Sequence, residues 1–415
     1  MPPRFLALLL TLAATVTALQ ARGTPSLEPP PLPASEVRAL WVVRDSLTSA
    51  ASVQSVVDQA VAGGFNTLFV QVRGRGDAYY LGTEPRAEAL RGQPDAFDPL
   101  QQILVRARSA GLQVHAWVNV NLVSSAVTLP AARDHIVNRH PEWLMVPRAL
   151  AQEFAVTATG PGHVGRLARW TRAQADVEGL FLSPIVPGAA TYTVNVITEL
   201  VRRYALDGVH LDYIRYPGTE FDYSRAALDA FAASVAPTLP AAQRARLAAM
   251  AHDDVLAWVD AYPDQWIEFR RSRLTALVMR VRSAVRAERP HLLVSAAVAP
   301  DAAEAAAQRL QDWQLWAENG LVDVVCPMAY TTDLAVFTRQ IGDAISLAGR
   351  TAVWAGIGAY RLTPAQTVTH IEAARAAGAR GIVLFSYDKM VERPSSGYLD
   401  ALRKAAFHPA RTATP

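Results

Sequence analysis

Short apolar runs rich in β-branched residues alternate along the chain with longer segments that are rich in Ala, Leu and Arg and have a helical spacing of apolar positions. This alternation is typical of βα units, in which a buried parallel strand is followed by a helix. The runs predict eight strands, over Val37 to Val43, Asn66 to Val72, Leu112 to Asn119, Asp207 to Tyr213, Leu292 to Val298, Val322 to Met328, Ala352 to Gly358 and Gly381 to Tyr387. Because eight such units close into a barrel, we predict an α/β fold, a (β/α)8 TIM barrel.

A glycine stands just before five of these strands, at the end of the preceding helical segment. These glycines are Gly64, Gly111, Gly320, Gly349 and Gly378. Glycine accepts the left-handed conformation that often ends a helix, so these positions mark the amino-terminal face of the barrel. Functional residues are therefore expected at the opposite face, directly after each strand.

Two connections are much longer than the others, Asn119 to Leu206 and Ile214 to His291. Each contains a helical part, Val194 to Tyr204 and Trp266 to Ala287, and the first also carries Pro/Gly-rich stretches such as SPIVPGAATY. We expect long insertions after strands three and four that build up the rim of one cleft. A separate inserted domain is the alternative, but neither connection has a complete alternating pattern of its own.

The amino-terminal segment has the order of a secretory signal peptide. Arg4 precedes an apolar run from Phe5 to Val16, and small residues follow at Ala18 and Ala21. The run is too short for a stable membrane anchor. We predict a signal peptide over residues 1–21, a Pro-rich linker over 22–35, one barrel domain over 36–408 and a tail over 409–415. A cytosolic protein with an apolar amino terminus is the alternative to export to the periplasm or the extracellular space.

The formal net charge of +3 comes almost entirely from arginine, because Lys389 and Lys404 are the only lysines. The arginines are scattered over predicted helix faces, so nucleic-acid binding is not indicated. Cys326 is the only cysteine, which excludes an intramolecular disulfide, and its apolar strand VDVVCPM indicates an inert core thiol. The histidines are dispersed and no HExxH motif occurs, so neither a metal site nor a cofactor is predicted.

Polar and aromatic residues follow all eight predicted strands. In strand order they are Arg44 and Asp45; Arg73, Arg75 and Asp77; Asn119 and Asn121; His210, Asp212, Tyr213, Arg215 and Tyr216; Asp301; Tyr330 and Asp333; Tyr360 and Arg361; and Ser386, Tyr387 and Asp388. A sugar ring has apolar C–H faces and a rim of hydroxyl groups. Aromatic rings beside carboxylates and amides suit both, so the composition of this face favours a carbohydrate ligand.

The segment LDGVHLDYIRYP, Leu206 to Pro217, is the sharpest chemical signal. Side chains alternate along a strand, so His210 and Asp212 share a face that points into the barrel mouth. A carboxylate there can act as nucleophile, as base or as stabiliser of an oxocarbenium-like transition state. A structural aspartate bonded to Arg215 is the alternative. Asp207, before Gly208 at the start of the strand, suits a turn.

Six segments together carry a resemblance to a known family. VRALWVVRD, QVRGRGDAYY, HAWVNVNL, LDGVHLDYIRYP, VDVVCPMAY and GIVLFSYD, in this order, resemble the family-10-like glycosyl hydrolases, which are exported bacterial barrel proteins. The resemblance runs from about Glu36 to about Ala406. It implies cleavage of a cell-envelope or extracellular polysaccharide.

The chitinase family 18 offers a more distant comparison, because its fourth strand also begins DG and carries alternating carboxylates that end in a glutamate acid. Here His210 stands at the middle carboxylate, Asp212 matches the last aspartate, and Ile214 occupies the place of the acid. The substrate-assisted mechanism of that family is therefore not supported.

We accordingly predict a glycoside hydrolase with Asp212 as one catalytic carboxylate. Hydrolysis normally needs a second carboxyl group as proton donor, and the candidates by position are Asp301, Asp333 and Asp388, with Asp45 and Asp77 behind them. The predicted substrate-binding residues are Arg73, Asp77, Asn119, His210, Tyr213, Arg215, Tyr330, Tyr360 and Tyr387. The rival hypothesis is a noncatalytic glycan-binding protein on a degenerate barrel.

Overall fold

The structure is a computed structural model that describes residues 32–33, 35–157, 160–392 and 397–407. The predicted signal peptide over 1–21 and the predicted tail over 409–415 lie outside the described residues. The predicted linker over 22–35 lies outside them too, except for residues 32, 33 and 35.

Eight parallel strands form a closed barrel, which confirms the predicted TIM barrel. Their bounds are β1 Val37–Val42, β2 Thr67–Arg73, β3 Gln113–Asn119, β6 Gly208–Asp212, β7 Leu293–Val298, β8 Val324–Ala329, β9 Ala352–Ile357 and β10 Gly381–Leu384. Their order around the barrel is β1-β10-β9-β8-β7-β6-β3-β2. All eight overlap the runs predicted from the apolar pattern.

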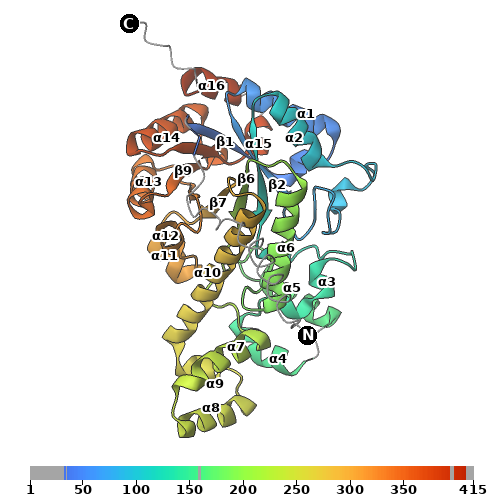
Figure 1. Cartoon of the computed structure of the whole chain (residues 1–415), viewed down its shortest axis with the longest axis vertical. Coiled ribbons are helices and arrows are strands. Elements are labelled where there is room, and N and C mark those ends of the chain that lie inside the picture. Colours follow the sequence, from blue (N-terminus) through green and yellow to red (C-terminus); the bar gives the residue numbers. More distant parts are fainter. Residues whose placement is uncertain (1–31, 34, 158–159, 393–396, 408–415) are drawn as a thin grey trace, which may run out of the picture.

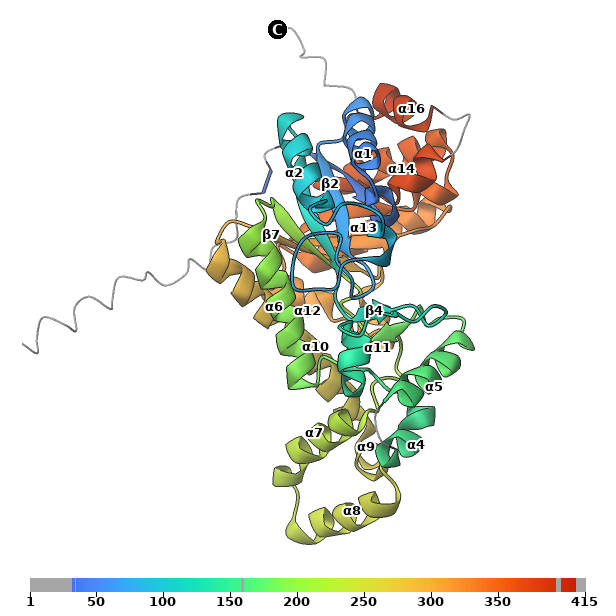
Figure 2. The same cartoon turned by 90° about the vertical axis from the view of Figure 1, so that its right-hand side faces the viewer.

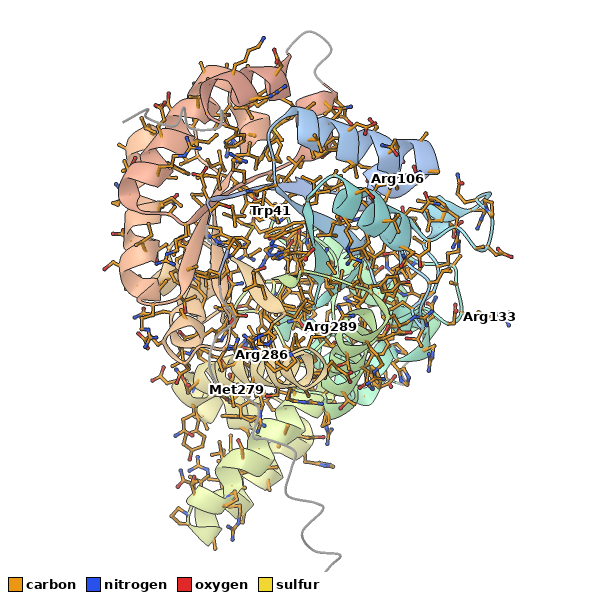
Figure 3. The ribbon with its side chains drawn as sticks, turned by 45° about the horizontal axis from the view of Figure 1, so that its top comes forward. Trp41, Arg106, Arg133, Met279, Arg286 and Arg289 are labelled. Atoms are coloured by element: carbon orange, nitrogen blue, oxygen red, sulfur yellow. The ribbon has the colours of Figure 1, made fainter. Side chains whose placement is uncertain are left out.

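Alternation along each strand divides the apolar residues between two cores. In β1, Ala39 and Trp41 belong to a cluster inside the barrel that also contains Phe69 and Cys326. Trp41 is labelled among the strands in Figure 3. The alternate residues of each strand face outward and join a larger cluster between the strands and the surrounding helices. The barrel interior is therefore filled by side chains, and chemistry is confined to its end.

Helices surround the barrel in the order expected of βα units (Figure 1). They are α1 Ala50–Ala62, α2 Pro99–Ser109, α6 Pro187–Arg203, α10 Pro263–Glu288, α11 Ala302–Gln308, α12 Trp313–Glu318, α13 Leu334–Ala348, α14 Pro364–Ala377, α15 Tyr387–Val391 and α16 Tyr398–Ala405. The five glycines that precede strands all have positive φ angles. No helix among the described residues is long and apolar enough to cross a membrane.

The two long connections contain elements of their own. Between β3 and α6 lie β4 Leu122–Ser124, α3 Ile136–Arg139, α4 Ala151–Val156, α5 Pro161–Arg172 and β5 Leu180–Phe181; between β6 and α10 lie α7 Arg225–Val235, α8 Ala241–Asp253 and α9 Ala257–Ala261. Two small hydrophobic clusters hold these elements together. Figure 2 shows α4, α5 and α7 to α9 projecting from one end of the barrel.

Candidate active site

Asp212 is the last residue of β6, and its register partner on β3 is Asn119. The chain turns sharply after it, because Tyr213 has a φ of 49°. A left-handed tyrosine is uncommon and costs free energy, and such positions cluster at functional sites. The turn brings the Tyr213 backbone N–H within 2.7 Å of Asp212 Oδ1, to which it donates a hydrogen bond.

The Asp212 carboxyl group is buried, and only 8% of the residue is exposed. Trp117 Nε1–H donates to Asp212 Oδ2 at 3.0 Å, and the Trp117 ring lies 6.4 Å from that of Phe385, between centroids. Burial raises the pKa of Asp212 from 3.8 to about 6, although the Tyr213 N–H, the Arg215 charge and the Trp117 N–H oppose the rise. A carboxyl group with this pKa can exchange a proton near neutral pH.

His210 lies two residues earlier on the same face of β6, fully buried below Asp212. Its Nε2 accepts a hydrogen bond from Trp41 Nε1–H at 3.1 Å, so its Nδ1 carries the proton and lies 2.9 Å from Ser295 Oγ. The ring also stacks on Phe69, with 4.3 Å between centroids. Burial lowers the pKa of His210 well below its usual value. The structure thus gives His210 a packing role, and its predicted contact with substrate stays a prediction.

Arg73, at the end of β2, is 1% exposed and forms several hydrogen bonds beside the site. Its Nε lies 2.5 Å from Glu84 Oε2, and its Nη1 donates to the Asn119 carbonyl oxygen at 2.6 Å. Asn119 in turn donates from Nδ2 to the Gly74 carbonyl oxygen at 2.8 Å. These bonds tie the end of β2 to the end of β3, next to Asp212. Direct contact of Arg73 or Asn119 with substrate stays a prediction.

A second group of side chains surrounds the turn that follows Asp212. The Arg215 guanidinium lies over the Tyr213 ring, 4.8 Å from its centroid, and its Nη2 donates to Glu178 Oε1 at 2.6 Å. Arg75 Nη1 donates to the Glu178 carbonyl oxygen at 3.2 Å. Burial and the neighbouring charge of Asp212 raise the pKa of Tyr213 to about 12.

Glu178 was not predicted from the sequence. It stands in the insertion after α5, in a stretch without strand or helix periodicity, and only the fold brings it beside Arg215. The sole local signal is the glycine that follows it, because a Cβ at Gly179 would lie 2.0 Å from the Ser124 carbonyl oxygen. A close approach of two backbone segments requires glycine at that position.

Two tyrosines follow the ends of β8 and β9. The Tyr330 ring stacks on Phe385 with 5.5 Å between centroids, and the Tyr360 ring lies 6.1 Å from that of Tyr330. Burial and the Asp212 charge raise the pKa of Tyr330 well above its usual value. Tyr360 is 38% exposed, so it offers an accessible ring next to that of Tyr330.

The predicted second carboxylates have local partners. Asp301 Oδ1 accepts from the Glu304 N–H at 2.9 Å and caps α11, and Asp333 Oδ1 accepts from the Ala335 N–H at 2.8 Å and caps α13. Asp388 Oδ1 accepts from Ser386 Oγ at 2.5 Å. Capping accounts for Asp301 and Asp333 without a catalytic role. Their assignment as proton donors stays a prediction.

The other predicted residues lie in local contacts too. Asp77 Oδ1 accepts from the Arg75 N–H at 2.9 Å, and Asp45 is exposed beside Arg44. The Tyr387 hydroxyl lies 3.4 Å from Ser55 Oγ on α1, which places this ring against the helix layer. Among the described residues, no group of three or more His, Cys, Asp or Glu side chains is placed to hold a metal ion.

A family model described as glycosyl hydrolase-like 10 matches residues 36–369, which is most of the chain. The chain belongs to this glycosyl hydrolase-like family. The match confirms the resemblance identified from the six segments, and it covers seven of the eight barrel strands, from β1 to β9.

Curated relatives match parts of the chain. Glycosyl hydrolase YngK of Bacillus subtilis (strain 168) is 26% identical over 222 residues, which are 47% of this chain and 38% of that protein. Glycosyl hydrolase DigH of Escherichia coli (strain K12) is 29% identical over 168 residues, 38% of this chain and 34% of that protein. The chain therefore spans less than two fifths of the length of these relatives.

Solved structures share the barrel. The glycoside hydrolase domain of PgaB (BpsB) from Bordetella bronchiseptica aligns with a TM-score of 0.60 at 17% identity, over 89% of this chain and 98% of that chain. The catalytic domain of β-amylase from Paenibacillus polymyxa aligns with a TM-score of 0.59 at 11% identity, over 90% of this chain and 98% of that chain. At such low identity these likenesses support the fold alone.

Proposed function

We propose that this protein is a glycoside hydrolase that cleaves a cell-envelope or extracellular polysaccharide, with Asp212 as a catalytic carboxyl group at the carboxyl end of the barrel. The observation that carries the proposal is the burial of Asp212 and its effect on the pKa of the carboxyl group. Asp212 has a buried carboxyl group at a strand outlet, and burial raises its pKa to about 6. An ionisable group with a displaced pKa at a strand outlet is typical of an active site.

The surroundings of Asp212 suit a sugar. Tyr330 and the partly exposed Tyr360 offer ring faces, and Arg215 and Arg75 offer N–H donors on the other side. Sugars bind through stacking on aromatic rings and hydrogen bonds to their hydroxyl groups. Membership of a glycosyl hydrolase-like family supports the same reaction class. The signal-peptide pattern of residues 1–21 supports an exported protein that meets envelope or extracellular glycans.

Two observations favour catalysis over binding alone. The rival hypothesis has Asp212 neutralised by an arginine, yet Arg215 pairs with Glu178, and no ion pair joins Asp212 to any basic side chain in the described part of the chain. Instead, both carboxyl oxygens of Asp212 accept hydrogen bonds from neutral N–H groups of Trp117 and Tyr213. Neutral donors leave the carboxyl group free to gain and lose a proton.

Replacement of Asp212 by Asn tests the proposal. The amide keeps the size of the side chain but carries no charge and no transferable proton, so turnover of a cleaved glycan should fall by a factor of ~10³ or more while binding changes little. Asp229→Asn is the matched control, because Asp229 is exposed on α7 and pairs with Arg225. If Asp212→Asn stays folded and turns over normally, Asp212 is not catalytic. If the wild-type protein binds the glycan without ever cutting it, the hydrolase proposal fails.

A further inference from the structure

We propose that Glu178, which the inserted loop places beside Arg215, is the second catalytic carboxylate. In this arrangement Asp212 is the proton donor, and Glu178 is the group that acts at the sugar carbon. The inference rests on the proposed function and deepens it by naming the pair of groups and dividing their roles.

The loop that carries Glu178 is fixed to the barrel by backbone contacts. β4 follows directly after β3 and pairs antiparallel with β5, which begins two residues after Glu178. The Leu182 N–H donates to the Asn121 carbonyl oxygen at 2.7 Å, and Asn121 Nδ2 donates to the Arg215 carbonyl oxygen at 3.2 Å. The same short sheet therefore positions Glu178 and the residues that follow Asp212.

Gly179 makes this path possible. An added Cβ at this position would lie 2.0 Å from the Ser124 carbonyl oxygen on β4. The backbone of residue 179 thus passes against β4, and Glu178 is held at the edge of the two-stranded sheet. Arg75, from the outlet of β2, donates to the Glu178 carbonyl oxygen at 3.2 Å and fixes the same point from the other side.

The two carboxyl groups lie in opposite environments. Glu178 pairs with Arg215 at 2.6 Å, and 34% of its side chain is exposed. Asp212 is buried, and its two carboxyl oxygens accept hydrogen bonds from the neutral N–H groups of Trp117 and Tyr213. A buried acid beside a solvated, hydrogen-bonded carboxylate is the division of labour expected of glycosidases.

Electrostatics links the pair directly. The negative charge of Glu178 is one of the causes that raise the pKa of Asp212, after the larger effect of burial, and the charge of Arg215 lowers it. The charge of Arg215 therefore acts on both groups, through the ion pair with Glu178 and through its electrostatic effect on Asp212. Arg215 is a positioning residue that keeps Glu178 in place and moderates its repulsion of Asp212.

The proposed chemistry balances. The bond between the anomeric carbon and the leaving oxygen breaks with its electron pair on oxygen, and that oxygen takes the proton of Asp212. The anomeric carbon is attacked by water, which gives a proton to Glu178, or by Glu178 itself. In the second case water later attacks the anomeric carbon of the glycosyl ester, gives its proton to the deprotonated Asp212 and releases Glu178. The distance between the two carboxyl groups around the bound sugar decides between these mechanisms. Direct attack by water inverts the configuration of the anomeric carbon, and attack by Glu178 retains it.

Three variants on one confirmed glycan test whether Glu178 is catalytic. Glu178→Gln should lower kcat by a factor of ~10³ or more, as expected for loss of one catalytic carboxylate, with glycan affinity and thermal unfolding close to wild type. Asp176→Asn is the control, because Asp176 is an exposed residue two positions away on the same loop. The kcat of this variant should stay within about threefold of wild type, as expected for a change at the surface. Equal activity of the two variants, with wild-type cleavage intact, overturns the inference but leaves the proposed function standing.

The division of roles is tested with the glycosyl fluoride of the same sugar, whose leaving group needs no proton. Asp212→Asn should recover to within about tenfold of wild type on the fluoride, whereas Glu178→Gln should remain inactive, since general acid catalysis contributes ~10²–10⁴ only where the leaving group needs it. The reverse pattern, or equal losses on the fluoride, overturns the assignment. Should Glu178→Gln unfold, Glu178→Ala with added azide replaces it, and azide must then restore turnover.

Discussion

Burial of the Asp212 carboxyl group should lower the free energy of unfolding at neutral pH. This effect can be measured without knowing the substrate. The pKa of Asp212 is raised in the folded state from 3.8 to about 6. The folded protein therefore holds this proton more tightly than the unfolded chain, and the free energy of unfolding falls as pH rises through this window. The shift corresponds to about 3 kcal/mol once both states are ionised, and to roughly 2–3 kcal/mol between pH 4 and pH 8.

Asp212→Asn removes this proton linkage. Its amide group also places an N–H against Trp117 Nε1–H, so the variant loses a hydrogen bond worth about 1–2 kcal/mol at every pH. The difference in unfolding free energy between the variant and the wild type should nevertheless shift in favour of the variant by roughly 2–3 kcal/mol from pH 4 to pH 8. Urea denaturation at several pH values measures this slope.

Asp229→Asn supplies the comparison for the pH series. It makes the same chemical change at an exposed site on α7, where the carboxylate pairs with Arg225 in water. Its stability difference from wild type should vary by no more than about 0.5 kcal/mol over the same range, because exposed ion pairs contribute little. A flat difference for Asp212→Asn, equal to that of the control, would refute the claim that burial controls the proton of Asp212.

Two further substitutions test the supports of the site. Arg73→Met leaves Glu84 buried without its partner, so the free energy of unfolding measured in urea should fall by about 3–5 kcal/mol; an unchanged value would contradict the buried ion pair. Gly208→Ala places a Cβ 2.3 Å from His115 Nδ1. It should lower stability by about 3 kcal/mol, and the double variant with His115→Ala should regain much of that loss, whereas additive losses would show that crowding is not the cause.

The barrel could be predicted because its strands are short, apolar and separated by helical segments. All eight predicted runs overlap strands of the structure, and each run is buried on both faces, as parallel strands require. The five glycines were also predicted correctly, because a positive φ angle restricts the residue type at a helix end. Local patterns of this kind depend on neighbouring residues alone.

The proposal of Glu178 as second carboxylate rests on contacts that local patterns miss. Asp301 and Asp333 were chosen because they follow strands, but each also precedes a helix, where Asp is favoured as a cap. A position directly after a strand does not distinguish an aspartate that caps a helix from a catalytic one. Glu178 lies 59 residues beyond the end of β3 and reaches Arg215 only through pairing of β4 with β5. Contacts set by such long-range pairing leave no periodic trace in the sequence.

Helix α10 has a mechanical consequence for the whole molecule. Its 26 residues span about 39 Å. Trp266 and Phe269, near its start, belong to the small cluster with α7 to α9, whereas Leu274 to Val285 contribute to the main core against the barrel. Arg286 Nη2, labelled in Figure 3, donates to Asp323 Oδ1 at 2.8 Å and anchors the far end. Because one uninterrupted helix belongs to both hydrophobic cores, we expect any displacement of α7 to α9 to be coupled mechanically to the wall of the barrel.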